Sequence, residues 1–207
     1  MKWSFGLVMV LTSAAGIPAV AQTLSPSFDC TKADGAAEEA VCASDALAAL
    51  DLETARLYEL ATASVEGEPL DMLQSFQRGW IKGRNECWKA EVALIDCVAA
   101  SYATRIHELR ASYPATQVES ADAISTGPWQ VTCGGLDTPV QAVFATTLVS
   151  LLWGENAVVL TRAETASGAI YDGVFYDGQP VTFWTKGQEA LFMPPGGVEM
   201  ACEIGSE

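Results

Sequence analysis

The spacing of apolar residues changes once along this chain of 207 residues, and the change divides it into two halves. From residue 36 to 113 the apolar residues recur at helical spacing, as Leu47, Leu50 and Leu57 do. After Pro128, short runs rich in Val, Thr, Phe and Trp alternate with turn residues, which is typical of antiparallel strands. The sequence therefore predicts an α+β protein in two domains, the first helical and the second made of strands.

The helical half should contain three helices. Ser44 or Asp45 is a suitable cap for a helix that runs to about residue 66, where a Gly-Glu-Pro stretch ends it. Two more helices are expected at about 70–86 and 91–112. The predicted domain, residues 22–113, is a small helical bundle. The polar stretch 114–127 shows no strong periodicity and is expected to be a linker.

The β-half, residues 128–207, contains eight candidate strands separated by glycine- or proline-rich breaks. Their expected ranges are 129–133, 140–146, 148–153, 157–162, 169–175, 181–185, 189–193 and 198–203. So many short strands in so short a segment predict a small closed barrel or a compact sandwich, because closure removes exposed strand edges.

The first 21 residues have the features of a secretory signal. Lys2 precedes an apolar stretch, and an Ala-x-Ala site at 19–21 precedes Gln22. The apolar stretch is too short to span a membrane. The first cysteine is Cys30, so no lipid attachment site follows the signal and no membrane anchor is expected. The protein is expected to be periplasmic or secreted.

Six cysteines in an exported chain favour three disulfide bonds. Six thiols can pair in many ways, and locality suggests Cys30–Cys42, Cys87–Cys97 and Cys133–Cys202. A metal site is disfavoured because the chain has one histidine and no Cys-x-x-Cys pair.

Charge and missing motifs exclude several function classes. The net charge of −15 argues against nucleic acids and anionic membranes as partners. No phosphate-binding or dinucleotide-binding glycine pattern is present, so no cofactor is expected. A serine hydrolase needs a histidine base, but His107, the only histidine, lies in the helical half and is expected to face solvent. We therefore expect no catalytic residues and a protein that is not an enzyme.

Two short segments of the β-half stand out. Lys186 is the only lysine after position 89, and Arg162 is the only other arginine or lysine after Arg110. Lys186 precedes Gly187, while Ser167 precedes Gly168 in the other segment. A Ser-Gly turn is often only a turn and an exposed lysine is often only solvated, but a single cation in so acidic a domain suits an anionic target.

The β-half resembles the MliC/PliC family, the bacterial envelope inhibitors of c-type lysozyme. The matching features include an early Cys-Gly-Gly, an Ala-Val-Val-Leu strand and a late cysteine. The two most specific blocks are Ser-Gly-Ala-x-Tyr at 167–171 and Phe-Trp-x-Lys-Gly-x-Glu-Ala at 183–190. The resemblance implies an eight-stranded antiparallel barrel and a c-type lysozyme as partner.

The same resemblance implies the site residues. In this family a serine and a lysine at the positions of Ser167 and Lys186 enter the lysozyme cleft. Gly168 and Gly187 would allow a close approach of the backbone, and Tyr171 would support the serine segment or simply pack. The chain differs from the family pattern at Val131, where an aromatic residue is common, and it lacks the cysteine of the lipid-anchored members.

The helical half resembles the LprI-type domain, which is also associated with lysozyme inhibition. The matching residues are the four cysteines of this half and a set that has the character of a scaffold: Glu38, Leu50, Asp51, Gln77, Trp80, Arg84, Tyr102, Arg105 and Ile106. No inhibitory residue can be assigned there.

The leading hypothesis is an inhibitor that occupies the lysozyme cleft. The first alternative is a periplasmic envelope protein that binds peptidoglycan or another muralytic enzyme. The second is an enzyme that acts on the cell wall. The natural target and the oligomeric state do not follow from the sequence.

Overall fold

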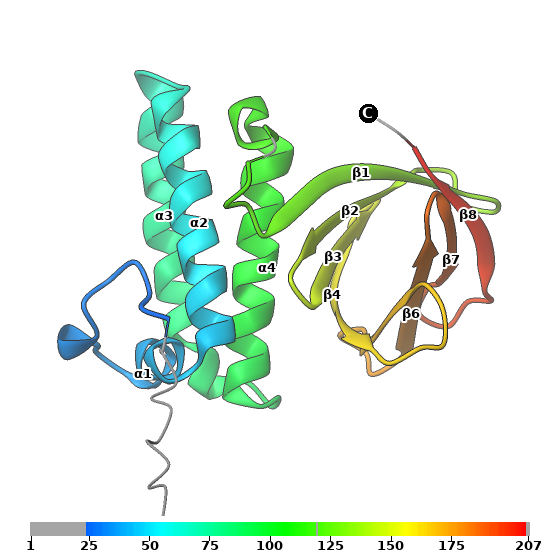
Figure 1. Ribbon diagram of the computed structural model, residues 1–207, viewed down its shortest axis with the longest axis horizontal. Coiled ribbons are helices and arrows are strands. Elements are labelled where there is room, and N and C mark those ends of the chain that lie inside the picture. Colours follow the sequence, from blue (N-terminus) through cyan, green and yellow to red (C-terminus); the bar gives the residue numbers. More distant parts are fainter. Residues whose placement is uncertain (1–23, 119, 206–207) are drawn as a thin grey trace, which may run out of the picture.

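The computed structural model of the protein describes residues 24–118 and 120–205. The expected signal peptide and its cleavage site lie outside the described residues. A helical half and a closed β-barrel lie side by side, and helix α4 is placed between the other helices and the barrel (Figure 1). The expected α+β architecture, with a helical bundle before an eight-stranded barrel, is confirmed.

Within the described residues four α-helices build the first half, one more than expected, because residues 36–43 form a short helix of their own before the cap at Ser44. They are α1 (Ala36–Ala43), α2 (Asp45–Ala63), α3 (Glu68–Asn85) and α4 (Leu94–Ser112). The Ser44 hydroxyl caps α2 by accepting a hydrogen bond from the Leu47 N–H at 3.4 Å. Pro69 lies in the first turn of α3, where its missing N–H has no cost.

Two disulfides staple this half, and both pairings agree with the prediction. Cys30–Cys42 ties the segment before α1 to that helix. Cys87–Cys97 joins the turn after α3 to the first part of α4. Because a domain of this size has only a small core, the two bridges stabilise it by limiting the conformational freedom of its unfolded chain.

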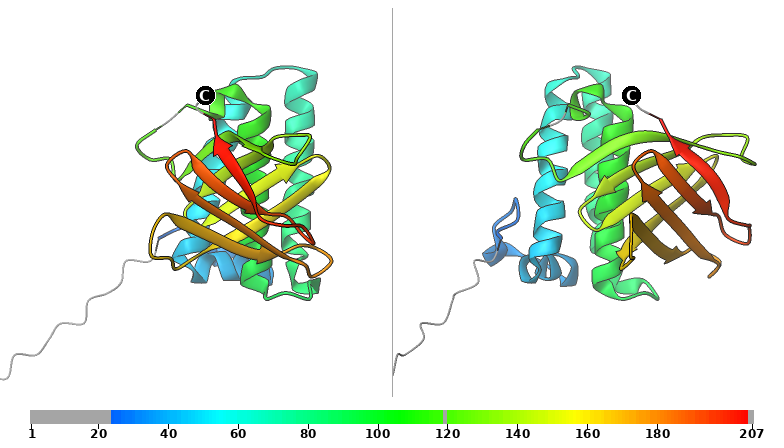
Figure 2. Two further views of the ribbon diagram at one scale, coloured as in Figure 1. Left: turned by 90° about the vertical axis from the view of Figure 1, so that its right-hand side faces the viewer. Right: turned by 45° about the vertical axis from the view of Figure 1, so that its right-hand side comes forward.

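The second half is a closed barrel in which each strand is antiparallel to the next (Figure 2). Its strands are β1 (Ser125–Cys133), β2 (Val140–Ala145), β3 (Leu148–Trp153), β4 (Asn156–Ala163), β5 (Ala169–Val174), β6 (Pro180–Lys186), β7 (Glu189–Met193) and β8 (Met200–Ile204). Cys133 and Cys202 face each other across β1 and β8 and form the third expected disulfide. The bridge therefore fastens the two strands whose pairing closes the barrel.

The segment between the halves is more ordered than a linker was expected to be. Strand β1 begins at Ser125, four residues before the expected start at Trp129, and residues 114–116 form a 3-10 turn. The buried Arg110 side chain at the end of α4 donates to the carbonyls of Thr116, at 3.0 Å, and Gly127, at 2.5 Å. These bonds hold both ends of the segment against the helical half.

Strands β2 and β3 are covered on both faces. Val140, Ala142, Val149 and Leu151 belong to the barrel core. Their neighbours Val143, Ala145 and Leu148 pack in the core that is centred on the helices. This double burial explains why these two strands are almost continuously apolar and lack the alternation of a half-exposed strand.

The expectation that His107 faces solvent is wrong. Its side chain is 0% exposed, and Nδ1 lies 3.1 Å from both the carbonyl oxygen and the hydroxyl of Ser150 on β3. Because α4 lies between two layers, it has no single solvent face in its second half. Burial lowers the pKa of His107, so the ring is neutral at pH 7.

Candidate functional site

The two sequence blocks meet at one end of the barrel. Strands β5 and β6 are antiparallel neighbours, and Ala169 lies opposite Thr185. Ser167 comes two residues before Ala169, and Gly187 comes two residues after Thr185. The register therefore brings the loop 164–168, here called the serine loop, next to the hairpin 186–189, here called the lysine turn.

A hydrogen bond joins the serine loop to the strand that carries Lys186. The indole Nε1 of Trp184 donates to the Ser167 carbonyl at 3.0 Å. The hydroxyl of Thr165 donates to the same carbonyl at 3.2 Å, from within the loop. The backbone of Ser167 is thus fixed while its side chain remains exposed.

Gly168 is required by the packing of the serine loop. Its φ of +72° is a conformation that residues with a Cβ adopt rarely. A Cβ at this position would also collide with the Thr185 carbonyl and the Trp184 indole. Glycine therefore lets the loop lie directly on strand β6.

Lys186 ends β6 at the start of a tight hairpin. The central residues are Gly187 and Gln188, and Gly187 has a φ of +63°, a value suited to glycine in a two-residue turn. Lys186 lies opposite Glu189 across the hairpin, yet within the described residues its ammonium forms no ion pair. An exposed cation in this position is available to a partner.

Tyr171 has a different environment from the other expected site residues. Its side chain is 5% exposed and packs inside the barrel, with its ring centroid 5.7 Å from that of Phe144. Burial raises the pKa of Tyr171, and the positive charge of Arg162 acts in the opposite direction. Tyr171 therefore braces the wall behind the serine loop rather than presenting a surface.

Sequence reasoning placed Trp184 in a motif but gave it no role. The structure shows that this side chain, which is half-buried, links the two segments of the site. One sequence signal could have identified it. Trp184 is an aromatic residue with a hydrogen-bond donor, and it lies two residues before Lys186, near the end of a strand.

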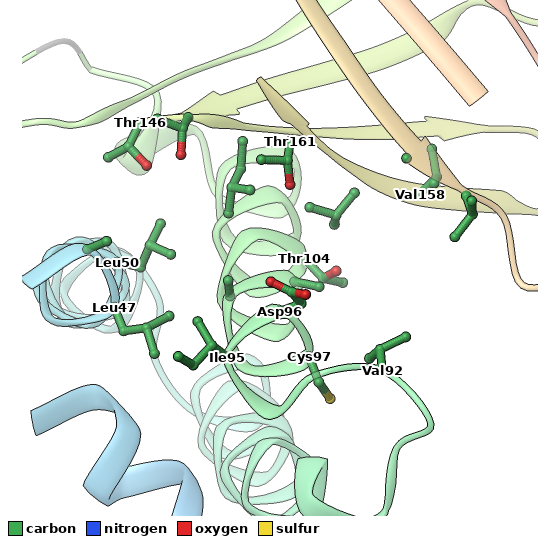
Figure 3. Close-up of a pocket in the computed structure, with 18 of the residues that line it drawn as sticks. Leu47, Leu50, Val92, Ile95, Asp96, Cys97, Thr104, Thr146, Val158 and Thr161 are labelled. Carbon is green, nitrogen blue, oxygen red and sulfur yellow. The ribbon is translucent and has the colours of Figure 1, made fainter. Parts of the chain in front are cut away.

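A larger cavity than those beside the two loops lies elsewhere in the described residues. It has a volume of about 610 Å³, lies between α2, α4 and strands β3 to β5, and is lined mostly by apolar side chains such as Leu47, Ile95 and Val158 (Figure 3). Asp96 on α4 is one of its few charged residues. Neither Ser167 nor Lys186 lines it, so this junction between the halves is separate from the paired loops.

The described part of the chain offers neither a metal site nor a membrane-spanning helix. Across residues 24–118 and 120–205, no group of three or more His, Cys, Asp or Glu side chains is placed to hold a metal ion. No helix in these ranges is long and apolar enough to cross a bilayer.

The fold and the site together define a class of protein: a disulfide-closed barrel that offers a hydroxyl and an ammonium on two adjoining loops. Residues 131–200 match the family model described as membrane-bound lysozyme-inhibitor of c-type lysozyme, MliC. Residues 30–109 match the family model of the lysozyme inhibitor LprI. Both resemblances noted in the sequence are thereby confirmed. No curated protein and no solved structure gives a match.

Proposed function

We propose that this protein inhibits c-type lysozyme by inserting the serine loop and the lysine turn into the active-site cleft. The observation that carries the proposal is that the segments of Ser167 and Lys186 lie side by side at one end of the barrel. Both segments are within the residues that match an inhibitor family. The helical half matches a second inhibitor family, which supports the same target.

The chemistry of the two side chains suits this target. Lysozyme cleaves its polysaccharide with two carboxyl groups that flank the scissile bond. The Lys186 ammonium would pair with the ionised carboxylate, and the Ser167 hydroxyl can donate to or accept from either protonation state. Gly187 allows the turn to enter closely, and Tyr171 keeps the wall behind the serine loop in place. The protein acts by occupying the cleft and performs no turnover.

The distribution of charge supports docking in one orientation. From residue 128 to 207 the chain has two basic and nine acidic residues, so the barrel attracts a basic enzyme. The two basic residues, Arg162 and Lys186, lie at or next to the ends of β4 and β6, at the loop end of the barrel. The acidic body would speed encounter with the basic enzyme, while the ammonium of Lys186 would meet the acidic cleft.

The proposed location is the periplasm or the secreted fraction. The basis is the signal-like segment 1–21 and the three disulfides, which form in oxidising compartments. Peptidoglycan in the same compartment is the polymer that such an inhibitor would protect.

The test is the lysis of a bacterial wall suspension by a c-type lysozyme, with the mature protein from Gln22 added at increasing concentration. Wild type should protect the walls. Lys186→Ala should weaken the complex by about 2–5 kcal/mol, because the enzyme's carboxylate would be left buried without a partner. Ser167→Ala should weaken it less. Lys82→Ala, which removes an exposed lysine of α3, is the matched control and should protect like wild type.

Other outcomes would redirect the proposal. Protection that survives in both Lys186→Ala and Ser167→Ala would move the inhibitory surface to the helical half. Absence of protection by wild type would leave the peptidoglycan-binding alternative, which a pelleting assay with purified walls would then detect.

A further inference from the structure

Arg162 is the second cation of the barrel, and it belongs to neither the serine loop nor the lysine turn. It is the penultimate residue of β4, directly before the serine loop. Its backbone N–H donates to the Thr147 carbonyl at 2.7 Å, which ties it to the turn between β2 and β3. The strand register places it opposite Tyr171. Arg162 therefore lies at the same end of the barrel as Ser167 and Lys186.

The side chain of Arg162 projects at the rim of the barrel. On β4 it follows the inward positions of Val158 and Leu160, which are 7% and 0% exposed, at the spacing of two that keeps side chains on one face. Arg162 itself is exposed, because the barrel ends there. The positive charge of Arg162 lowers the pKa of the buried Tyr171 on the neighbouring strand, against the larger effect of burial. These observations place the guanidinium above the barrel core.

A shallow cavity of about 420 Å³ adjoins this guanidinium. Its lining consists of Thr147, Arg162, Ala163, Glu164, Thr165 and Gly168. Three of these residues, Glu164, Thr165 and Gly168, belong to the serine loop, so a partner that contacts Ser167 would also cover the cavity. Two threonine hydroxyls add neutral hydrogen-bonding groups to its wall.

Arg162 has no internal counter-ion in the described part of the chain. Glu164 lines the same cavity, but its carboxylate is not within ion-pair distance of the guanidinium. No other carboxylate of the described residues forms an ion pair with Arg162 either. A guanidinium has five donors in a planar fork that matches both oxygens of a carboxylate. The residue is thus equipped for an anion of that shape.

We propose that Arg162 and its cavity form a second carboxylate-binding site, which holds an acidic side chain at the rim of the lysozyme cleft while Lys186 pairs inside the cleft. This inference rests on the proposed function. The carboxylate is assigned to the bound enzyme rather than to a free anion, because the exposed cavity gains a dry environment only when a partner covers the serine loop. Arg162 would therefore add specificity for lysozymes that carry an acid at the matching place.

The experiment measures the dissociation constant of the mature protein with a c-type lysozyme by titration calorimetry. Arg162→Ala should weaken binding about tenfold, as expected for a charge-assisted bond near the edge of an interface. Arg162→Lys should recover part of the loss, since it keeps the charge without the fork. Arg162→Glu should weaken binding more than Arg162→Ala, an order that a purely structural role would not produce.

Arg78→Ala is the matched control, because Arg78 is an exposed arginine on α3, away from the barrel. Melting temperatures of all variants would confirm that they are folded. If Arg162→Ala binds like Arg78→Ala while Lys186→Ala is weakened, the second site is refuted and the proposed function stands. If wild type forms no complex at all, both are refuted.

Discussion

The two halves of the molecule treat their charged residues in opposite ways. In the helical half, Arg84 is 5% exposed and donates to the Tyr102 hydroxyl at 2.6 Å and to Glu38 at 3.3 Å. The Tyr102 hydroxyl in turn donates to Asp51 at 2.8 Å. In the barrel, Arg162 and Lys186 are exposed and have no ion pair among the described residues.

This contrast distinguishes buried charges that stabilise the fold from exposed charges that are free to bind a partner. A buried arginine must have its donors satisfied inside the molecule, because an unpaired buried charge is very costly. An exposed cation has no such requirement, and it contributes little to stability whether paired or not. Substitution of a buried charge in the helical half should therefore affect stability, and substitution of the two exposed cations of the barrel should affect binding.

The largest expected effect tests the first side of the comparison. Arg84→Ala should lower the free energy of unfolding by about 3–5 kcal/mol, because Asp51 and Glu38 would lose their buried partner. Urea unfolding of the disulfide-intact protein measures this change. Arg78→Ala, an exposed arginine of the same helix, should change stability by less than about 0.5 kcal/mol. Similar losses in the two variants would contradict the distinction.

The second prediction concerns the backbone of the serine loop. Gly168→Ala should cost about 1–3 kcal/mol of strain and displace the loop, so inhibition of lysozyme should fall. Gly178→Ala is the control: it has a positive φ of +81° in the hairpin at the opposite end of the barrel, but an added Cβ would meet nothing within 4 Å. Inhibition should survive that change. Equal inhibition by both variants would show that the loop need not rest on β6.

A smaller effect is expected from the link between the two loops. Trp184→Phe keeps most of the ring but removes the donor to the Ser167 carbonyl. The net value of such a bond is about 1 kcal/mol, so the dissociation constant for lysozyme should rise about fivefold. Trp88→Phe, which alters an exposed tryptophan of the helical half, should leave it unchanged. If the Trp184→Phe variant binds like wild type, the hydrogen bond from Trp184 does not contribute to the site.

The effect that is smallest at neutral pH tests whether the junction of the halves responds to acid. Burial holds the pKa of His107 below its ordinary value of 6.5, so the unfolded chain binds a proton that the folded protein does not. Stability should thus be complete above about pH 6.5 and fall as the pH drops below it, by at most about 1.4 kcal/mol per unit. His107→Gln should flatten this part of the melting-temperature profile between pH 5 and 7. An unchanged slope in the variant would assign the dependence to other groups.

Local features of the chain were predictable because their causes are local. The eight strands, the cap at Ser44 and the turn at Gly187 each depend on a few neighbouring residues. The disulfide pairing also followed from locality, because each bridge joins cysteines of the same half. Positions of Ser167 and Lys186 were identified by resemblance to a family motif.

Features that depend on contacts between distant segments were missed. His107 is 43 residues from its partner Ser150, and Ser125 donates to Glu53 across 72 residues. Helical periodicity alone could not reveal that α4 packs against other helices on one side and against strands of the barrel on the other. The early start of β1 has the same cause, because its first residues are held by side chains of the helical half.

The sequence by itself determined most of the helices and strands and the residue types at the site, because propensity and turn chemistry act over short distances. Only the tertiary structure decided which of these residues meet. Strand register placed the serine loop against the lysine turn, packing turned Trp184 into a link between them, and the pairing of β4 with β5 set Arg162 opposite Tyr171. These placements result from the joint burial of apolar surface by both halves, which no single segment of the chain encodes.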